Sequence, residues 1–223
     1  MTRRQWARWG VLAGTLWASG CNGGGTQPPG PPADLMPSGG GGQSWYFNNP
    51  LPMPLSVTVF DVSGRPVPRV VVTWTVTSGA GSGAVNPVQS TTSALGIAST
   101  NDSVGSGTIQ RVSATVNGLL SAASFTEIAT VPPTSATVTL ENFAFNPQNS
   151  VVQTGGTVTW MWNDGTAFHT LNFNVNDPTP RPLDTPQQQS GSVAFKFTTV
   201  GSYPFFCLLH QAQGMTGKVT VVH

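Results

Sequence analysis

One loop near the C-terminus combines three potential metal ligands. Cys207, His210 and Met215 follow one another with the spacing Cys-x2-His-x4-Met, between two segments in which apolar and polar residues alternate. Alternation with a period of two predicts β-strands. The loop therefore joins two predicted strands, and any fold of this region must hold a thiol, an imidazole and a thioether together in one turn.

The donor set indicates the class of metal. Thiolate and thioether are soft donors, and a trigonal set of two His and one Cys with a weak axial Met is typical of blue-copper sites. The loop supplies only one of the two histidines. The chain holds three, and His169 follows a strongly alternating segment, residues 158–162, across a short turn. We therefore predict a copper site built from His169, Cys207, His210 and Met215.

Each of these ligands, taken alone, has a simpler interpretation. A buried Cys is commonly a small hydrophobic residue and a Met commonly fills a core, while a single His is more often a surface or structural residue. The order, spacing and strand context of the four together favour copper binding over this alternative. His223, the last residue, has no partners in sequence, and we expect it to be a solvated terminus.

Residues 135–223 resemble the plastocyanin-type cupredoxins. The resemblance rests on the four ligands and on the segments 143–147, 156–160 and 217–221. It implies an antiparallel β-sandwich of Greek-key type with one copper ion near one end, under an apolar cap. It also implies that the loop histidine, His210, reaches the surface through an apolar patch and passes the electron there.

Two positions depart from the pattern of this family. Thr170 stands where Asn usually follows the first ligand, and Leu209 stands where Pro often precedes the loop histidine. Hydrogen bonds around the ligands and the stiffness of the loop tune a metal site. We therefore expect both changes to affect the reduction potential rather than the choice of metal.

A second region of β pattern covers residues 45–130. Apolar and polar residues alternate through 70–77, and Gly- and Ser-rich turns recur at intervals expected of a β-sandwich. The segments 61–74, 92–96 and 112–118 resemble bacterial Ig-like domains of the invasin and intimin group. The predicted fold class is all-β, with an Ig-like sandwich and a cupredoxin sandwich in tandem. A Pro-containing linker, residues 131–134, joins them, and the first domain is expected to be a spacer or interaction module.

The first 44 residues predict export and attachment. Residues 1–20 combine an Arg-rich start with a short apolar stretch, which is typical of a signal peptide and too short to span a membrane. Residues 18–21 resemble a bacterial lipobox, which implies cleavage before Cys21 and lipid attachment to its sulfur. Ordinary secretory cleavage is the alternative, because Ala18 stands where Leu is commoner. Residues 21–44 are rich in Gly and Pro, and we expect a disordered tether.

The charge content argues against a nucleic-acid-binding protein, and the cysteine content argues against a disulfide. Charged residues make up only 8% of the chain, and removing the three arginines of the leader leaves six basic residues against eight acidic ones. No basic surface remains for nucleic acid. Of the two cysteines, Cys21 would carry the lipid and Cys207 the metal, so no disulfide is expected.

The predicted function is that of a membrane-tethered carrier of single electrons in the bacterial cell envelope, periplasmic or surface-exposed. The chain is not expected to be an enzyme or to have a small-molecule substrate. It has no His-x-His pair for a trinuclear copper centre, and only Cys207 where a dinuclear centre would need two cysteines. The expected partners are a redox protein that docks transiently around His210 and the membrane, through lipidated Cys21. A cell-surface adhesion or scaffold protein and a copper storage or delivery protein are the alternatives.

Overall fold

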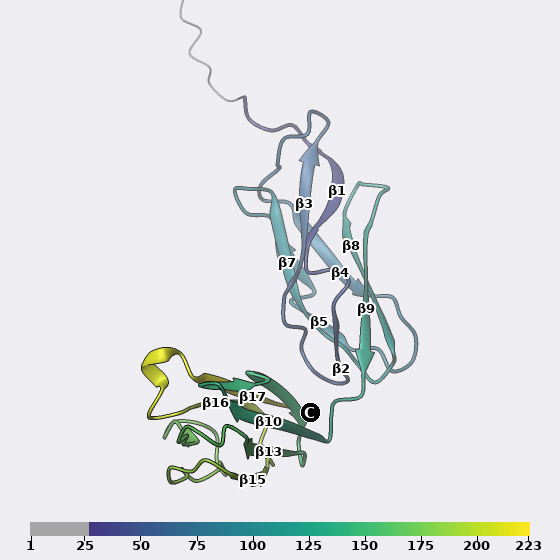
Figure 1. Cartoon of the computed structure of the whole chain (residues 1–223). Coiled ribbons are helices and arrows are strands. Elements are labelled where there is room, and N and C mark those ends of the chain that lie inside the picture. Colours follow the sequence, from purple (N-terminus) through teal and green to yellow (C-terminus); the bar gives the residue numbers. More distant parts are fainter. Residues whose placement is uncertain (1–26) are drawn as a thin grey trace, which may run out of the picture.

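The computed structural model describes residues 27–223. Within this part of the chain the structure consists of strands β1 to β17 and one short 3-10 helix, η1 (Gln211–Gln213). Two separate clusters of buried hydrophobic side chains divide the strands into two units, which Figure 1 shows one after the other along the chain. The prediction of an all-β fold with two tandem sandwiches is confirmed.

The N-terminal sandwich consists of two facing sheets. Their strand orders are β1-β3-β7-β5 and β2-β9-β8-β4-β6. The strands are β1 (Pro32–Gly39), β2 (Ser44–Tyr46), β3 (Leu55–Asp61), β4 (Val71–Val76), β5 (Ala84–Asn86), β6 (Gln89–Thr91), β7 (Ile97–Ser103), β8 (Ile109–Val116) and β9 (Ala123–Thr130). Burial alternates residue by residue along β8 and β9, as the sequence pattern predicts. Leu55, Trp74 and Phe125 belong to the core that this alternation builds between the sheets.

The prediction of a disordered tether over residues 21–44 is wrong for the second half of this range. Strand β1 pairs antiparallel with β3 at the edge of a sheet, and β2 begins at Ser44. A single apolar residue, Leu35, points into the core and is 4% exposed. Pro32 and Pro37 are compatible with β1 because an edge strand leaves part of its N–H groups unpaired. The Gly- and Pro-rich composition therefore concealed an edge strand.

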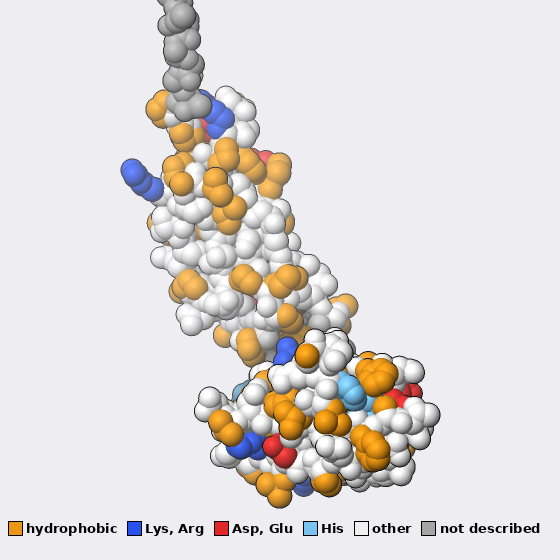
Figure 2. Space-filling view, turned by 60° about the vertical axis from the view of Figure 1, so that its left-hand side comes forward, with side chains coloured by type: hydrophobic (Ala, Val, Ile, Leu, Met, Phe, Trp, Pro, Cys, Tyr) orange, Lys and Arg blue, Asp and Glu red, His pale blue; other side chains and the backbone are white. Residues whose placement is uncertain are grey.

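Some predictions about the N-terminal part remain without a structural test. The signal peptide, residues 1–20, and the lipid-attachment residue Cys21 lie outside the described residues. The likeness of the N-terminal sandwich to the invasin and intimin group stays a prediction. No helix among residues 27–223 is long and apolar enough to cross a membrane. The surface seen in Figure 2 carries few charged side chains, in keeping with the composition.

The C-terminal sandwich also consists of two sheets. Their strand orders are β11-β10-β13-β15 and β12-β17-β16-β14. The strands are β10 (Ser135–Glu141), β11 (Ala144–Asn146), β12 (Asn149–Gln153), β13 (Thr157–Trp162), β14 (Asn172–Phe173), β15 (Gly191–Lys196), β16 (Gly201–Phe206) and β17 (Thr216–Val222). The expectation of a wholly antiparallel sandwich is wrong, because β10 pairs in parallel with β13 and β12 with β17. After β11 the chain crosses to the other sheet to form β12 and then returns to the first sheet as β13. Strand β13 therefore runs in the same direction as β10.

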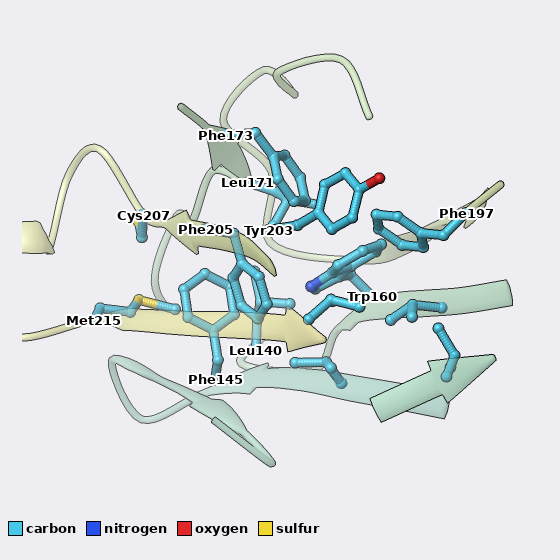
Figure 3. Close-up of a cluster of buried hydrophobic side chains, with 14 of the residues drawn as sticks. Leu140, Phe145, Trp160, Leu171, Phe173, Phe197, Tyr203, Phe205, Cys207 and Met215 are labelled. Atoms are coloured by element: carbon cyan, nitrogen blue, oxygen red, sulfur yellow. The ribbon is translucent and has the colours of Figure 1, made fainter. Parts of the chain in front are cut away.

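An aromatic core fills the C-terminal sandwich (Figure 3). The alternating segment predicted for residues 158–162 is strand β13, and Val158, Trp160 and Trp162 are all buried on one face. The ring of Trp160 packs edge-on against Phe205, with centroids 5.6 Å apart. Phe145 meets Phe205 in the same manner at 4.7 Å. Such pairs contribute about 0.5–1.5 kcal/mol each beyond the burial of their area.

The two sandwiches touch at the end of β17. The backbone N–H of His223 donates to Asn49 Oδ1 at 3.0 Å, and Trp45 and Val222 line a shallow groove between the units. The loop between β16 and β17, which carries the predicted ligands, lies at the opposite end of β17 (Figure 1). The predicted copper site is therefore remote from the junction.

Candidate metal centre

The loop between β16 and β17 is closed by its own backbone. The N–H of Cys207 donates to the carbonyl of Met215 at 3.1 Å, and the N–H of Met215 donates to the carbonyl of His210 at 3.1 Å. The N–H of His210 donates back to the carbonyl of Cys207 at 3.2 Å. Gly214 supplies the left-handed turn, with φ of 87°, that ends η1. The three predicted ligands of this loop thus start from fixed backbone positions.

His169 reaches the same place from the connection between β13 and β14. Its backbone N–H and carbonyl both pair with Gln188, at 3.0 and 3.1 Å. Its carbonyl also accepts the indole N–H of Trp162, at 3.0 Å. The imidazole is fully buried. The alternating strand predicted from the sequence therefore positions this histidine through the indole of its last residue.

The two imidazoles and the thiol converge. Cys207 Sγ lies 3.5 Å from His210 Nδ1 and 3.9 Å from His169 Nδ1, and the two Nδ1 atoms are 3.2 Å apart. Metal bonds of about 2.0–2.3 Å to nitrogen and sulfur place donors of a trigonal plane about 3.5–4 Å apart. The two distances from Sγ lie in this range and the distance between the Nδ1 atoms is slightly shorter, so the three atoms are placed to hold one metal ion between them.

Met215 completes the group at one end of the aromatic core. It is buried, and Figure 3 shows its side chain and that of Cys207 at the same end, beside Phe145 and Phe205. A soft thioether next to a thiol and two imidazoles is the donor chemistry of copper rather than of hard cations. All four predicted ligands are therefore brought to one end of the sandwich, three of them with their donor atoms in mutual contact.

Thr170 connects the two loops that carry the ligands. Its backbone N–H donates to Cys207 Sγ at 3.4 Å. Its hydroxyl donates to Asn172 Oδ1 at 2.7 Å and accepts the N–H of Leu208 at 2.8 Å. Thr170, which replaces the Asn that is usual at this position, therefore links the first ligand segment to the loop after Cys207.

Asp164 is a site residue that the sequence analysis missed. Its Oδ2 lies 3.0 Å from Nε2 of His169, and its side chain is 8% exposed. Hydrogen bonds from the Thr166 hydroxyl and from His169 hold the pKa of this carboxyl well below its usual range. The only sequence signal for it was an acid five residues before the first ligand, in a turn that contains Gly165.

The protonation state of His210 also suits a ligand. Burial, and secondarily the positive charge that His169 can carry, lower the pKa of His210. A metal-binding imidazole must be unprotonated at the donor nitrogen. The lowered pKa therefore extends the range of pH over which His210 can bind a metal.

Hydrophobic side chains surround the exposed edge of the site. His210 is partly exposed, whereas His169 and Cys207 are fully buried. Figure 2 shows histidine surface flanked by hydrophobic side chains on the C-terminal sandwich. The apolar patch is defined here by Phe143, Phe168, Leu208 and Leu209, each at least 39% exposed. Of these, Phe143 contacts the ring of His210 edge-on and Leu209 precedes it in the chain, so hydrophobic side chains lie beside the exposed histidine.

Comparisons with known proteins address the C-terminal sandwich. The profile of the family described as copper binding proteins, plastocyanin/azurin family, matches residues 133–222. The plastocyanin of Scenedesmus fuscus is 34% identical over 84 residues, which cover 34% of this chain and 85% of that protein. The chloroplastic plastocyanin of Tetradesmus obliquus is 34% identical over 84 residues, covering 34% of this chain and 57% of that protein.

Two solved structures give further likenesses. A reduced amicyanin variant is 25% identical, with 39% of this chain and 81% of that one covered and a TM-score of 0.35. Oxidised plastocyanin from Dryopteris crassirhizoma is 26% identical, with 39% and 99% covered and a TM-score of 0.33.

The C-terminal sandwich and its converging ligands define a cupredoxin. Through this unit the chain belongs to the plastocyanin/azurin family of copper-binding proteins. Its cofactor is one copper ion.

Proposed function

We propose that this protein is a one-electron carrier with a single blue-copper site, held by His169, Cys207, His210 and Met215. The observation that supports the proposal is the convergence of two inward-facing Nδ1 atoms and one buried thiol within 4.8 Å of one another. Bound copper would supply a couple between Cu(I) and Cu(II). The protein is proposed to have no substrate of its own and not to be an enzyme.

The chain's own contribution is a fixed frame for the ligands. The backbone hydrogen bonds among Cys207, His210 and Met215, and the paired contacts of His169 with Gln188, hold the donors in place independently of a metal. Ligands that move little when the charge of the site changes favour fast electron transfer. Burial of Cys207 and Met215 keeps water away from the sulfur atoms, and such a dry shell also tunes the reduction potential.

The proposed route for the electron is through His210. It is the one of the four ligands that is not fully buried, and Phe143 of the apolar patch contacts its ring. A redox protein that docks there would make a small apolar contact with few charges. Small contacts of this kind are transient, and rim charges mainly govern the rate and salt dependence of association. We therefore expect docking that depends weakly on salt.

The remaining parts of the proposal concern location. We propose that the chain is exported to the bacterial cell envelope and anchored through Cys21, on the basis of the leader sequence alone. The N-terminal sandwich would then act as a spacer between the anchor and residues 135–223. Its proposed extent is revised to include β1, so that the tether ends near residue 30.

The test is to add Cu(II) to the chain lacking residues 1–20 and to record the visible and EPR spectra. We expect an intense charge-transfer band from thiolate to copper with narrow hyperfine splitting. Cys207→Ser should abolish the band, whereas the matched variant Cys21→Ser should keep it. A colourless wild-type protein would refute the proposal. Met215→Leu should retain copper and raise the reduction potential. If the wild-type protein instead lost its copper during redox cycling, a storage or delivery role would be favoured.

A further inference from the structure

The carboxylate of Asp164 joins three segments around the first ligand. Its Oδ1 accepts the N–H of Ala167, at 3.2 Å, and the hydroxyl of Thr166. Its Oδ2 accepts the backbone N–H of Asn142 at 3.1 Å and lies 3.0 Å from Nε2 of His169. The side chain is nearly buried. A carboxylate with four donors aimed at it is a fixed part of the structure, not a mobile surface acid.

The contact with His169 determines which nitrogen of the ring carries the proton. An ionised carboxylate can only accept hydrogen bonds, so the proton must lie on Nε2. The lone pair of Nδ1 then faces Cys207 and His210, where a metal ligand is needed. A carboxylate that accepts from a metal-binding histidine also makes the ring a stronger donor.

We propose that Asp164 is a positioning residue of the copper site, which fixes the tautomer and orientation of His169 and lowers the reduction potential through its negative charge. This inference rests on the proposed function. A nearby negative charge favours the oxidation state with the higher positive charge. The carboxylate therefore stabilises the oxidised form of the site more than the reduced form.

Asp164 also positions the aromatic ring at the rim of the site. Asn142 and Phe143 form the two-residue turn between β10 and β11, and both have positive φ, 50° and 58°. This conformation is unfavourable for a side chain as large as Phe, and the bond from Asn142 to Asp164 holds the turn in it. The ring of Phe143 then meets the rings of His210 and His169 edge-on, with centroids 4.7 and 5.9 Å away.

A purely structural role would make Asp164 a cross-link between two loops and nothing more. Such a cross-link would change stability but would leave the reduction potential of a folded, copper-loaded variant in place. The reduction potential of the copper site and the tautomer of His169 therefore distinguish the two roles. Glu141 provides a matched control, because it lies at the end of β10 beside the same turn. Its carboxylate contacts only Asn146 and Asn163 among the described residues, at 3.4 and 3.5 Å.

The experiment compares Asp164→Asn with Glu141→Gln in the full chain loaded with copper. Both remove one negative charge, but only the first replaces the carboxylate that accepts from His169 by an amide, whose single oxygen cannot serve all four donors around residue 164. We expect Asp164→Asn to weaken Cu(II) binding by about 10–100-fold, with a smaller effect on Cu(I). Each tenfold loss specific to Cu(II) raises the potential by about 59 mV. An unchanged potential in Asp164→Asn, or an equal rise in Glu141→Gln, would overturn the inference.

A second measurement needs no variant and no copper. Nitrogen-15 NMR of the apo protein at about pH 8, above the usual pKa of histidine, reports which nitrogen of His169 carries the proton. We expect a slowly exchanging proton on Nε2, and a proton on Nδ1 alone would refute the role of Asp164. Because this result is independent of copper, it separates a failure of the inference from a wild-type protein that forms no blue site.

Discussion

A buried polar cluster inside the N-terminal sandwich should make its stability depend on pH. Asp102 on β7, Gln110 on β8 and Glu127 on β9 all face the interior and are at most 1% exposed. The side-chain amide of Gln110 donates to Asp102 Oδ1, but Asp102 Oδ2 has no hydrogen-bond partner among the described residues. Burial, and in addition the charge of Glu127, raise the pKa of Asp102 to about 6.

The size and sign of the effect follow from this pKa. A rise from 3.8 to about 6, at about 1.4 kcal/mol for each pKa unit, corresponds to about 3 kcal/mol. The folded state keeps the proton longer than the unfolded state, so this stability is fully present below about pH 4 and is lost as the pH rises through about 6. Asp102→Asn keeps the acceptor for Gln110 and removes the charge. It should therefore stabilise the sandwich at neutral pH by up to about 3 kcal/mol and reduce the pH dependence.

Hydrogen exchange of peptides from β7, β8 and β9, followed in urea at a series of pH values, measures this domain separately from the copper domain. Asp34→Asn is the control, because it removes an acid from edge strand β1 instead of the interior. Burial also raises the pKa of Glu127, so part of the slope should persist in Asp102→Asn. A wild-type sandwich that gains stability from pH 4 to 7, or an Asp102→Asn variant less stable at neutral pH, would refute the reasoning.

Two further substitutions test the copper domain. Thr170→Val should destabilise the apo protein by about 1–3 kcal/mol, because it leaves the N–H of Leu208 and the side chain of Asn172 without their partner. Chemical unfolding of the apo form measures this loss of stability, and an unchanged midpoint would contradict the role of Thr170. Gly217→Ala should destabilise the apo protein by about 1–3 kcal/mol, because the new Cβ would lie 2.4 Å from the ring of Phe205. A thermal unfolding temperature equal to that of the wild type would contradict this, because it would show that the core can rearrange around the new methyl group.

The four candidate ligands could be predicted from the sequence because three of them have a local signal. The spacing of Cys207, His210 and Met215 within one loop already fixes their neighbourhood, and the small number of histidines left few choices for the remaining ligand. The alternation through Trp160 and Trp162 likewise identified a strand buried on one face. These features depend on neighbours along the chain, which a reader of the sequence can see.

The missed features depend on contacts between distant segments. Asp164 is only five residues from His169, but no periodicity shows that the turn between them folds back to bring the carboxylate to the ring, and the bond from Asn142 depends on the pairing of β10 with β13. Strand β1 was missed because one apolar residue, Leu35, in a Gly- and Pro-rich segment carries no periodic signal. The parallel pairs were missed because alternation predicts a strand but not the direction of its neighbour.

The contact between His223 and Asn49 and the ligand loop lie at opposite ends of β17. A seven-residue strand spans about 23 Å at about 3.3 Å per residue, so the candidate copper site lies about one strand length from this contact. Under the proposed function, a redox partner would therefore dock at a distance from this contact between the two sandwiches. If the proposed anchoring is right, a longer or shorter N-terminal sandwich would change the reach of the copper domain without altering the contacts around its ligands.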